Sequence, residues 1–246
     1  MVGYLKNKGS DDMYVKCLGT GSSGNCYALV DKVGNILLLD AGISLKEIKI
    51  GIDFQVSKIV GCLCTHAHSD HSLALKDIGK MGVPIVAPYL EKPKSDYIKG
   101  FVVMYFALTD SDGKFVHSNA DGSECPVYGF FITSDVEPLR MVYITDCEFC
   151  KYRFSELDTL LLGINYMDSK IDNEEETKKR HILNGHMSLD TGVEFIKVCD
   201  REKTLKNVIV CHMSESNSDE KIFGSEIRKV TDSNIYFARK GEAYQL

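Results

Sequence analysis

The feature that most constrains this chain is a dense run of metal-binding residue types at 66–71 (HAHSDH), directly after an apolar, strand-like segment. Three of the seven histidines lie in these six positions, together with one carboxylate. Because side chains two residues apart on extended backbone point to the same side, His66 and His68 are expected to face one point. Asp70 and His71 can turn towards a second point nearby. Imidazole and carboxylate together are ligands of zinc, iron and manganese, so the run predicts a metal site.

Composition bounds the function classes without choosing among them. The 246 residues are 44% hydrophobic and 26% charged, as in ordinary globular proteins. No apolar run approaches the roughly 20 residues of a membrane span, and the polar start at 1–12 lacks the apolar core of a signal peptide. These features predict a cytoplasmic protein that does not bind membranes. The net charge of −6 argues against a broad basic surface for nucleic acid but is compatible with a local one.

The nine cysteines agree with a cytoplasmic location. Their number is odd and the chain is too long to depend on disulfides, so reduced thiols are expected. Two close pairs, Cys62 with Cys64 and Cys147 with Cys150, raise the alternative of a structural zinc site. A zinc ribbon needs two cysteine pairs, each with two residues between the cysteines, as in Cys147 and Cys150. Cys62 and Cys64 have only one residue between them, so they do not form such a pair. Small buried thiols are therefore the prediction.

Short β-rich segments dominate the chain, and helices are interspersed among them. Strands are predicted at 14–18, 26–30, 36–39, 58–64, 84–87, 101–106, 114–117, 127–133, 141–145, 160–162, 208–211 and 235–238. Helices are predicted at 72–80, 174–182, 189–198 and 219–229. No linker or repeat appears, so 1–246 is predicted to be one domain, with 1–12 as a candidate disordered extension. An α/β fold with two mixed β-sheets flanked by helices, a four-layer αββα sandwich, fits this order, although periodicity alone does not separate it from other α/β folds.

The HxHxDH run at 66–71 resembles the signature of the metallo-β-lactamase superfamily. The segment 38–42, which ends a predicted strand, looks like the first motif of that family. The resemblance implies the αββα sandwich and a hydrolase that binds two divalent metal ions, zinc or manganese. It also implies that Asp40 holds the metal ligands in place without binding metal itself.

The same resemblance implies two adjacent metal sites built from distant parts of the chain. Their expected ligands are His66, His68, Asp70, His71, His117, Asp146 and His212. His117 would complete the first site, Asp146 would bridge the two metals, and His212 would join the second site. Asp70 is also assigned to catalysis. The context of His117 departs from the family, in which an acidic residue usually follows this histidine, because Ser118 stands here.

The glycine-rich turn at 19–25 makes the resemblance more specific. It is similar to the YycJ/WalJ-like group of cytoplasmic proteins with this fold, whose expected activity is DNA exonuclease. Three further segments resemble the same group, namely 162–166, 185–189 and 211–217. The likeness therefore spans most of the chain. Two positions depart from it, because Gly163 stands where the group commonly has Glu and Tyr166 stands where it has His.

The implied chemistry is hydrolysis of a phosphodiester in DNA by a metal-bound hydroxide. The expected substrate contacts are Ser22, Ser23, Gly24 and Asn165, the first three through backbone amides that can hold a phosphate. His186 precedes a predicted helix and is a catalytic candidate that could protonate the leaving oxygen. A histidine that only caps local backbone is the alternative.

A small-molecule hydrolase of the same fold, acting on a thioester, lactone or cyclic nucleotide, is the alternative function. Ribonucleases of the β-CASP branch carry a large inserted domain, for which there is no room between Asp146 and His212. A secreted β-lactamase lacks support without an export signal, and a mere binding module would not keep every ligand class. A basic groove beside the metals would favour a nuclease, and a closed apolar pocket would favour a small substrate.

Overall fold

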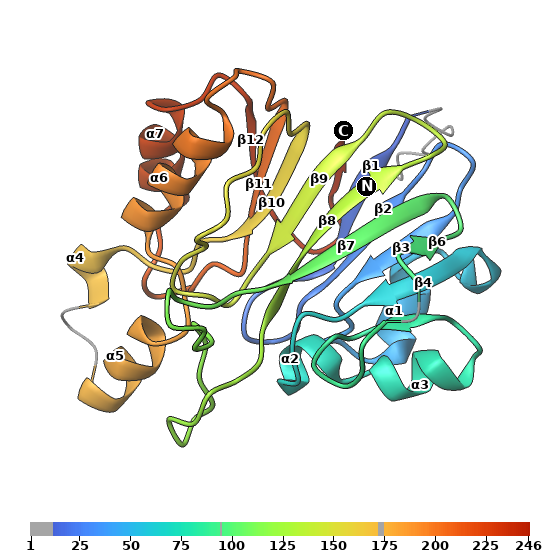
Figure 1. The fold of residues 1–246 in the computed structure, drawn as a ribbon, viewed down its shortest axis with the longest axis horizontal. Helices are drawn as coiled ribbons and strands as arrows, with labels where there is room; N and C mark the ends of the chain where they lie inside the picture. Colours follow the sequence, from blue (N-terminus) through green and yellow to red (C-terminus); the bar gives the residue numbers. More distant parts are fainter. Residues whose placement is uncertain (1–11, 94, 172–174) are drawn as a thin grey trace, which may run out of the picture.

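Two stacked β-sheets form the centre of the computed structural model, which describes residues 12–93, 95–171 and 175–246 (Figure 1). One sheet has six strands in the order β13-β1-β2-β3-β4-β5, and the other has seven in the order β12-β11-β10-β9-β8-β7-β6. Helices lie on the outer sides of both sheets. The predicted αββα sandwich with two mixed sheets is therefore confirmed.

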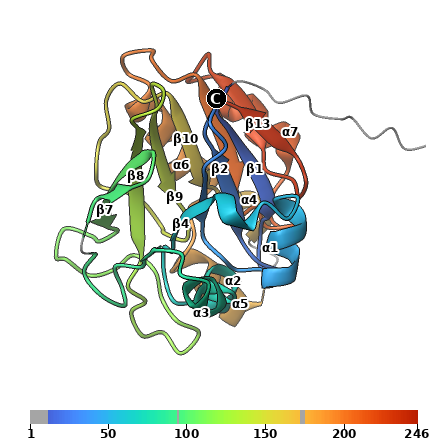
Figure 2. The same cartoon turned by 90° about the vertical axis from the view of Figure 1, so that its right-hand side faces the viewer.

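The six-stranded sheet combines antiparallel and parallel pairs. Its strands are β1 (Tyr14–Gly19), β2 (Cys26–Val30), β3 (Ile36–Leu39), β4 (Ile59–Leu63), β5 (Ile85–Val86) and β13 (Ala243–Gln245). β13, β1, β2 and β3 pair antiparallel, whereas β3, β4 and β5 pair parallel. Figure 2 shows β13 beside β1, so the last strand of the chain completes the sheet next to its first strand.

The seven-stranded sheet is divided in the same way. Its strands are β6 (Tyr97–Ile98), β7 (Phe101–Ala107), β8 (Tyr128–Ser134), β9 (Arg140–Ile144), β10 (Thr159–Gly163), β11 (Asn207–Cys211) and β12 (Asn234–Phe237). β6 to β9 are antiparallel neighbours, and β9 to β12 are parallel neighbours. The parallel part aligns the carboxyl ends of β9, β10 and β11 at one edge.

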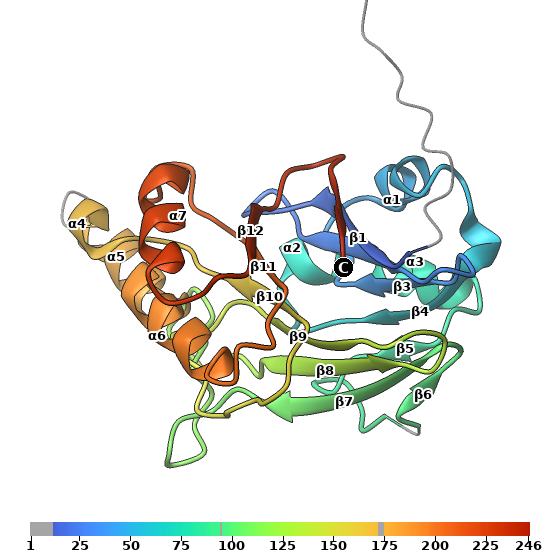
Figure 3. The same cartoon turned by 90° about the horizontal axis from the view of Figure 1, so that it is seen from above.

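The helices are short and lie in two groups. They are α1 (Leu45–Gly51), a 3-10 turn η1 (Val56–Lys58), α2 (Ser69–Ser72), α3 (Leu75–Lys80), α4 (Asp168–Ile171), α5 (Glu176–Leu183), α6 (Leu189–Cys199) and α7 (Glu220–Arg228). In Figures 1 and 3, α6 and α7 lie on one side of the molecule and α1 and α3 on the other. Within the described ranges, no helix has the length and apolar character to cross a membrane.

Apolar residues on both faces of the central strands explain the four layers. In β3, Leu37 lies in the core between the sheets, whereas Leu38 lies in the core under α1 and α3. In β10, Leu161 faces the other sheet, whereas Leu160 and Leu162 pack in the core with α6 and α7. Because successive side chains of a strand point to opposite faces, a strand that is apolar throughout must be covered on both sides.

The prediction of a strand at 114–117 is wrong. This segment makes only isolated bridges, such as Thr109 with Phe115. The carboxylate of Asp110 accepts a hydrogen bond from the backbone N–H of Lys114 at 2.9 Å and closes a local turn. The backbone of 114–117 therefore bonds to Asp110 and, through Val116, to Leu108 and Glu148, and it is not a strand of either sheet.

The helix predicted at 72–80 is divided into α2 and α3. The N–H of Ala74 donates to the carbonyl of Ala41 at 2.9 Å, so a contact with the segment after β3 replaces a bond within the helix. Sequence patterns also missed α1, β6 and β13. The predicted extension at 1–12 lies outside the described residues except for Asp12, as does the predicted helix start at Glu174.

Replacement of Leu161 by Ala should lower the free energy of unfolding by about 2–5 kcal/mol, because the lost side chain leaves a cavity between the two sheets. Leu161 is fully buried. Urea unfolding followed by circular dichroism measures the change. The matched control is Leu90→Ala, at a side chain that is 66% exposed, and it should change stability by no more than about 0.5 kcal/mol. Equal effects of the two substitutions would contradict the assignment of Leu161 to the inter-sheet core.

Candidate metal centre

The seven predicted metal ligands meet at one edge of the sandwich, where strands of both sheets end. β4 leads into the loop that carries the HxHxDH run, and β9 and β11 end just before Asp146 and His212. The ligands form two groups: His66, His68 and His117, and Asp70, His71, Asp146 and His212. Within each group the candidate ligand atoms lie within 4.8 Å of one another. The structure therefore brings together every residue that the sequence assigned to a metal.

Three residues at this edge have left-handed backbone conformations. The φ angles are 58° at Asp40, 49° at Asp146 and 52° at His212. Such conformations are uncommon outside glycine, and Asn, Asp and His tolerate them best. They store strain at positions that the surrounding structure holds in place. Each of the three follows the end of a strand, so the turn out of the strand aims its side chain at the site.

In the first group, the orientation of His66 and His117 is set by hydrogen bonds on their Nδ1 atoms. His117 Nδ1 donates to the carbonyl of Gly185 at 3.0 Å, and His66 Nδ1 lies 3.0 Å from the hydroxyl of Thr65. Since that hydroxyl donates to Asp40, it accepts from His66. Both Nε2 atoms thus carry lone pairs that face the group. Burial lowers the pKa of His66 well below its usual value and that of His117 to about 3, which favours the neutral, metal-binding form.

Asp146 belongs to the second group and also contacts the first. Its Oδ2 atom is 3.0 Å from His71 Nε2 and 3.6 Å from His66 Nε2, and its Oδ1 atom is 3.3 Å from His212 Nε2. Burial acts to raise the pKa of Asp146, but His212 and His71 outweigh it and hold the pKa well below its usual range. One buried carboxylate therefore contacts both groups, which is the geometry of a bridging ligand.

The two donor sets fit a pair of divalent cations. Among the described residues, Nε2 of His66 and Nε2 of His212 are buried without a hydrogen-bond partner. Buried polar atoms almost always have partners, so these two ring nitrogens, which lie within the ligand groups, are suited to bind cations. Three imidazoles at the first point, and two imidazoles with two carboxylates at the second, suit zinc or manganese.

Asp40 supports the second group from behind. Its carboxylate accepts hydrogen bonds from the backbone N–H of Thr65 at 2.8 Å, from His71 Nδ1 at 2.7 Å and from the hydroxyl of Tyr143 at 2.5 Å. With Nδ1 of His71 occupied as donor, Nε2 is left to face Asp146 and Asp70. This geometry agrees with the predicted supporting position of Asp40.

Residues 19–123 match the family model of the metallo-beta-lactamase superfamily, and this range contains Asp40 and the HxHxDH run. The matched segment is similar to that superfamily, and the four-layer sandwich is the metallo-β-lactamase fold.

Solved structures share the fold of this chain across almost its whole length. The protein YhfI from Bacillus subtilis has a TM-score of 0.67 at 15% identity, covering 96% of this chain and 100% of YhfI. Human tRNase Z, short form, has a TM-score of 0.60 at 18% identity, with 95% and 99% covered. Zinc-bound PqqB from Methylobacterium extorquens has a TM-score of 0.60 at 15% identity, with 95% and 100% covered. Among curated protein sequences, none matches.

Two supporting residues were missed by sequence reasoning. Tyr143 looked like one more apolar position of β9, and nothing in the pattern marked its hydroxyl as the partner of Asp40. Asn25 was noted only as the last residue of a glycine-rich turn. Its side chain bonds the backbone of Gly21 in both directions, at 2.9 and 3.0 Å, and its Nδ2 lies 3.1 Å from His71 Nε2. Asn25 therefore ties the turn to the metal-ligand loop.

A polar cavity of about 960 Å³ opens beside the second group. Its lining includes Ser22, Ser23, Asn165 and His186, the residues that the sequence analysis assigned to substrate contact and catalysis. Gly24 differs from the prediction. Its N–H donates to the carbonyl of Gly21 at 3.0 Å, so it is not available for a phosphate.

The backbone beside Gly24 explains why it is buried. A Cβ on Gly24 would lie 2.3 Å from the carbonyl oxygen of Gly42, so the glycine serves a close approach between two loops. Asn165 is also committed in part, because its Nδ2 donates to the carbonyl of His212 at 2.8 Å. Asn165 therefore both lines the cavity and helps to position His212, a candidate metal ligand.

His186 lies at the boundary between the metal centre and this cavity. Its Nδ1 is 3.5 Å from Asp146 Oδ1, and its ring stacks on that of His212 with centroids 5.3 Å apart. Its side chain is 12% exposed and lines the polar cavity. The structure thus places His186 next to the bridging carboxylate.

The charges in the cavity differ from those of a basic groove. None of the described residues that line it is Lys or Arg, and three are acidic: Glu215, Asp219 and Glu220. Glu220 pairs with Arg239, and Asp219 accepts backbone N–H groups at the start of α7. Much of this negative charge is therefore compensated locally.

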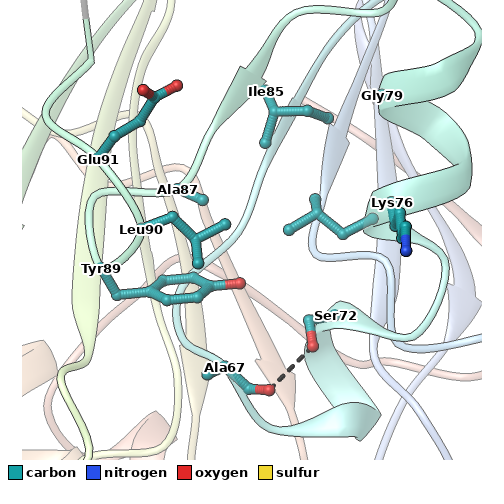
Figure 4. A pocket seen from close by; sticks show the side chains of 10 residues that line it. Ala67, Ser72, Lys76, Gly79, Ile85, Ala87, Tyr89, Leu90 and Glu91 are labelled. Atoms are coloured by element: carbon teal, nitrogen blue, oxygen red, sulfur yellow. Dashed lines mark hydrogen bonds between the residues drawn. The ribbon is translucent and has the colours of Figure 1, made fainter.

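A second cavity, of about 670 Å³, is bordered by the loop that carries the HxHxDH run and is mainly apolar. Figure 4 shows Tyr89 and Leu90 on one side of it and Lys76 of α3 on the other. Ala67, which stands between two ligand candidates, contributes to its wall. The loop that carries the HxHxDH run thus borders an apolar cavity, whereas His212 lines the polar one.

Replacement of Asp40 by Asn should weaken cation binding at the second group by about 10–100-fold, because His71 loses the carboxylate that orients it. Competition with a chromophoric chelator measures zinc affinity and stoichiometry. Asp53→Asn is the matched control, since Asp53 is an exposed partner of Lys16 and should leave both cations bound as in the wild type. An unchanged zinc affinity in folded Asp40→Asn would show that Asp40 does not position the site.

Proposed function

We propose that this protein is a metal-dependent hydrolase that cleaves phosphodiesters, with the ends of DNA as its substrate. The observation that carries the proposal is the position of Asp146 between two donor groups, with His186 beside the same carboxylate and a polar cavity in front of both. That arrangement offers two cation positions and a proton donor to one substrate. The similar fold of human tRNase Z, whose name describes a nuclease, supports this class of chemistry.

Membership of the YycJ/WalJ-like group is part of the proposal. The four segments that carry this resemblance are distant in sequence, yet each contributes to the polar cavity: 19–25, 162–166, 185–189 and 211–217. Motifs that meet at one cavity are expected when they serve one substrate. DNA as the partner and a cytoplasmic location stay predictions.

The chain's own residues suggest how the reaction is supported. Bound divalent cations supply charge that activates water and stabilises the developing negative charge on phosphoryl oxygens. Asp146 holds the two donor groups at a fixed separation, and Asp70, at the rim, is open to the substrate with 27% of its side chain exposed. His186 is in reach to hold a proton for the departing oxygen. The turn at Ser22 and Ser23 offers hydroxyl and amide donors to a phosphate.

A small-molecule hydrolase is the second candidate, and a specific observation favours it. The described lining of the polar cavity lacks Lys and Arg and includes three carboxylates, which is unfavourable for a long polyanion. A single terminal nucleotide, or a small ester, needs less positive charge than a duplex does. The volume of about 960 Å³ accommodates either.

Digestion of end-labelled linear double-stranded DNA with manganese or zinc tests the proposal. The wild type should remove nucleotides progressively from an end, and Asp146→Ala should lose more than about 100-fold of this activity, since loss of a ligand should exceed the cost of losing a ligand's supporting partner. The control variant is Asp158→Asn, a carboxylate outside the metal centre. No digestion by a wild type that binds two cations would exclude DNA and favour a small ester or thioester.

His186→Ala should lower kcat on the cleaved substrate by about 10²–10⁴-fold, the usual contribution of a positioned acid or base. Metal content by elemental analysis should stay that of the wild type, because His186 lies outside both ligand groups. A substrate with a more acidic leaving group should recover part of the loss, since it departs without a proton. If the variant loses a metal equivalent instead, His186 is a ligand and not an acid.

A further inference from the structure

Both ring nitrogens of His68 have a neighbour at hydrogen-bond distance, and neither neighbour is a backbone carbonyl that would fix its tautomer, as Gly185 does for His117. Its Nδ1 lies 3.1 Å from His117 Nε2, and its Nε2 lies 3.0 Å from the side-chain oxygen of Asn119. A neutral imidazole carries one proton, and the nitrogen without it is the one that can bind a cation. The tautomer of His68 therefore decides whether this group has two or three lone pairs at one point.

The contacts of Asn119 fix which end of its amide faces His68. Its Nδ2 lies 3.1 Å from the backbone carbonyl of Glu124 and 3.0 Å from the hydroxyl of Ser123. A carbonyl oxygen only accepts, so the atom facing it must be the NH₂ group. The oxygen of the amide then faces His68 Nε2, which must donate. His68 Nδ1 is left with a lone pair directed at His117.

The loop that carries Asn119 is held by its own hydrogen bonds. The N–H of Asn119 donates to the carbonyl of Ser123 at 2.8 Å, and the hydroxyl of Ser123 donates to Asp121 at 2.6 Å. At the loop's start, Ser118 donates to the carbonyl of Asn184 at 2.8 Å. A chain of hydrogen bonds thus runs from the carboxylate of Asp121 through Ser123 and Asn119 to His68. It lies just where the sequence departs from the family pattern, at Ser118 and the residues after it.

The other tautomer of His68 would close the group. With its proton on Nδ1, His68 would donate to His117 Nε2 across the 3.1 Å that separates them. His117 cannot avoid this by changing its own tautomer, because its Nδ1 donates to the carbonyl of Gly185. That internal hydrogen bond would occupy two of the three ligand atoms. Keeping the first cation position open therefore requires an acceptor on the Nε2 side of His68.

We propose that Asn119 is a positioning residue that holds His68 in the tautomer with its proton on Nε2 and so keeps the first cation position open. The proposal rests on the metal-dependent function proposed above. It assigns a task to the loop 118–124 that no motif in the sequence marked. Asn119 acts through His68 and does not itself contact a cation or the substrate.

Zinc affinity and stability, measured on Asn119→Ala, distinguish a positioning role of Asn119 from a purely structural one. Asn119→Ala should lower the affinity of the first position for zinc by about 10–100-fold and leave the second position unchanged. The metal-free variant should be as stable as the metal-free wild type, because His68 gains the hydrogen bond to His117. A residue that only supported the fold would lower stability and both affinities together.

The experiment combines zinc titration with nitrogen-15 NMR of the histidine rings in the metal-free protein. The wild type should bind two zinc ions and show His68 protonated on Nε2. Asn119→Ala should retain one tight zinc and show His68 shifted towards the Nδ1-protonated form. Asn119→Asp, which keeps an acceptor oxygen towards His68, should restore the first affinity. Asn234→Ala, at an asparagine on the far strand β12, is the matched control and should behave as wild type.

Each outcome decides between the proposals. Two tight zinc ions and an unchanged His68 tautomer in Asn119→Ala would overturn the task of Asn119 and leave the metal centre standing. A wild type that binds no zinc or manganese would overturn both. Loss of affinity at both positions with lower stability would make Asn119 structural and contradict the proposal. If Asn119→Ala fails to fold, Asn119→Leu, which has nearly the same size and no acceptor, replaces it in the same measurements.

Discussion

One buried carboxylate connects the sandwich to its chemistry. Asp40, at the end of β3, accepts hydrogen bonds from Thr65 after β4, from His71 in α2 and from Tyr143 in β9 of the opposite sheet. A charge without these donors would be costly to bury. Both sheets must therefore be in place for the carboxylate to be satisfied, and the carboxylate must be in place for His71 to face the metal centre. Packing of the two sheets and assembly of the metal centre therefore depend on each other.

The layers and the full ligand groups were predicted from the resemblance to the metallo-β-lactamase superfamily, and local patterns agree with it. Strands that are apolar at every position, such as β3 and β10, need cover on both faces, and the spacing of His66 and His68 lets them face one point. Sequence patterns were insufficient where a tertiary contact overrides local preference. Ala74 bonds to Ala41 and breaks a helix, and the carboxylate of Asp110 turns a predicted strand into a loop. The hydrophobic periodicity of a segment does not indicate such tertiary partners.

Supporting residues were missed for a related reason. Tyr143 satisfies the pattern of a buried strand, and Asn119 satisfies that of a polar loop, so neither breaks a local rule. Their tasks depend on one atom each, directed at a residue more than 50 positions away for Asn119 and more than 100 for Tyr143. The polar cavity raises a different issue, since its described lining lacks the basic residues that a broad DNA groove would have. The substrate proposed above would then bind chiefly through the metal centre and through hydroxyl and amide donors.

The left-handed backbone at Asp40, Asp146 and His212 has a consequence for how this centre can evolve. Only a few residue types occupy that conformation at low cost, and among metal-binding residues these are Asp, Asn and His. Cysteine at Asp146 or His212 would have to adopt the same turn without the local hydrogen bonds that make it tolerable. The turns out of β9 and β11 thus bias the centre against thiolate ligands and the soft metals that prefer them. The backbone conformation at these positions therefore contributes to the choice of metal ion, because it limits which ligand side chains can occupy them.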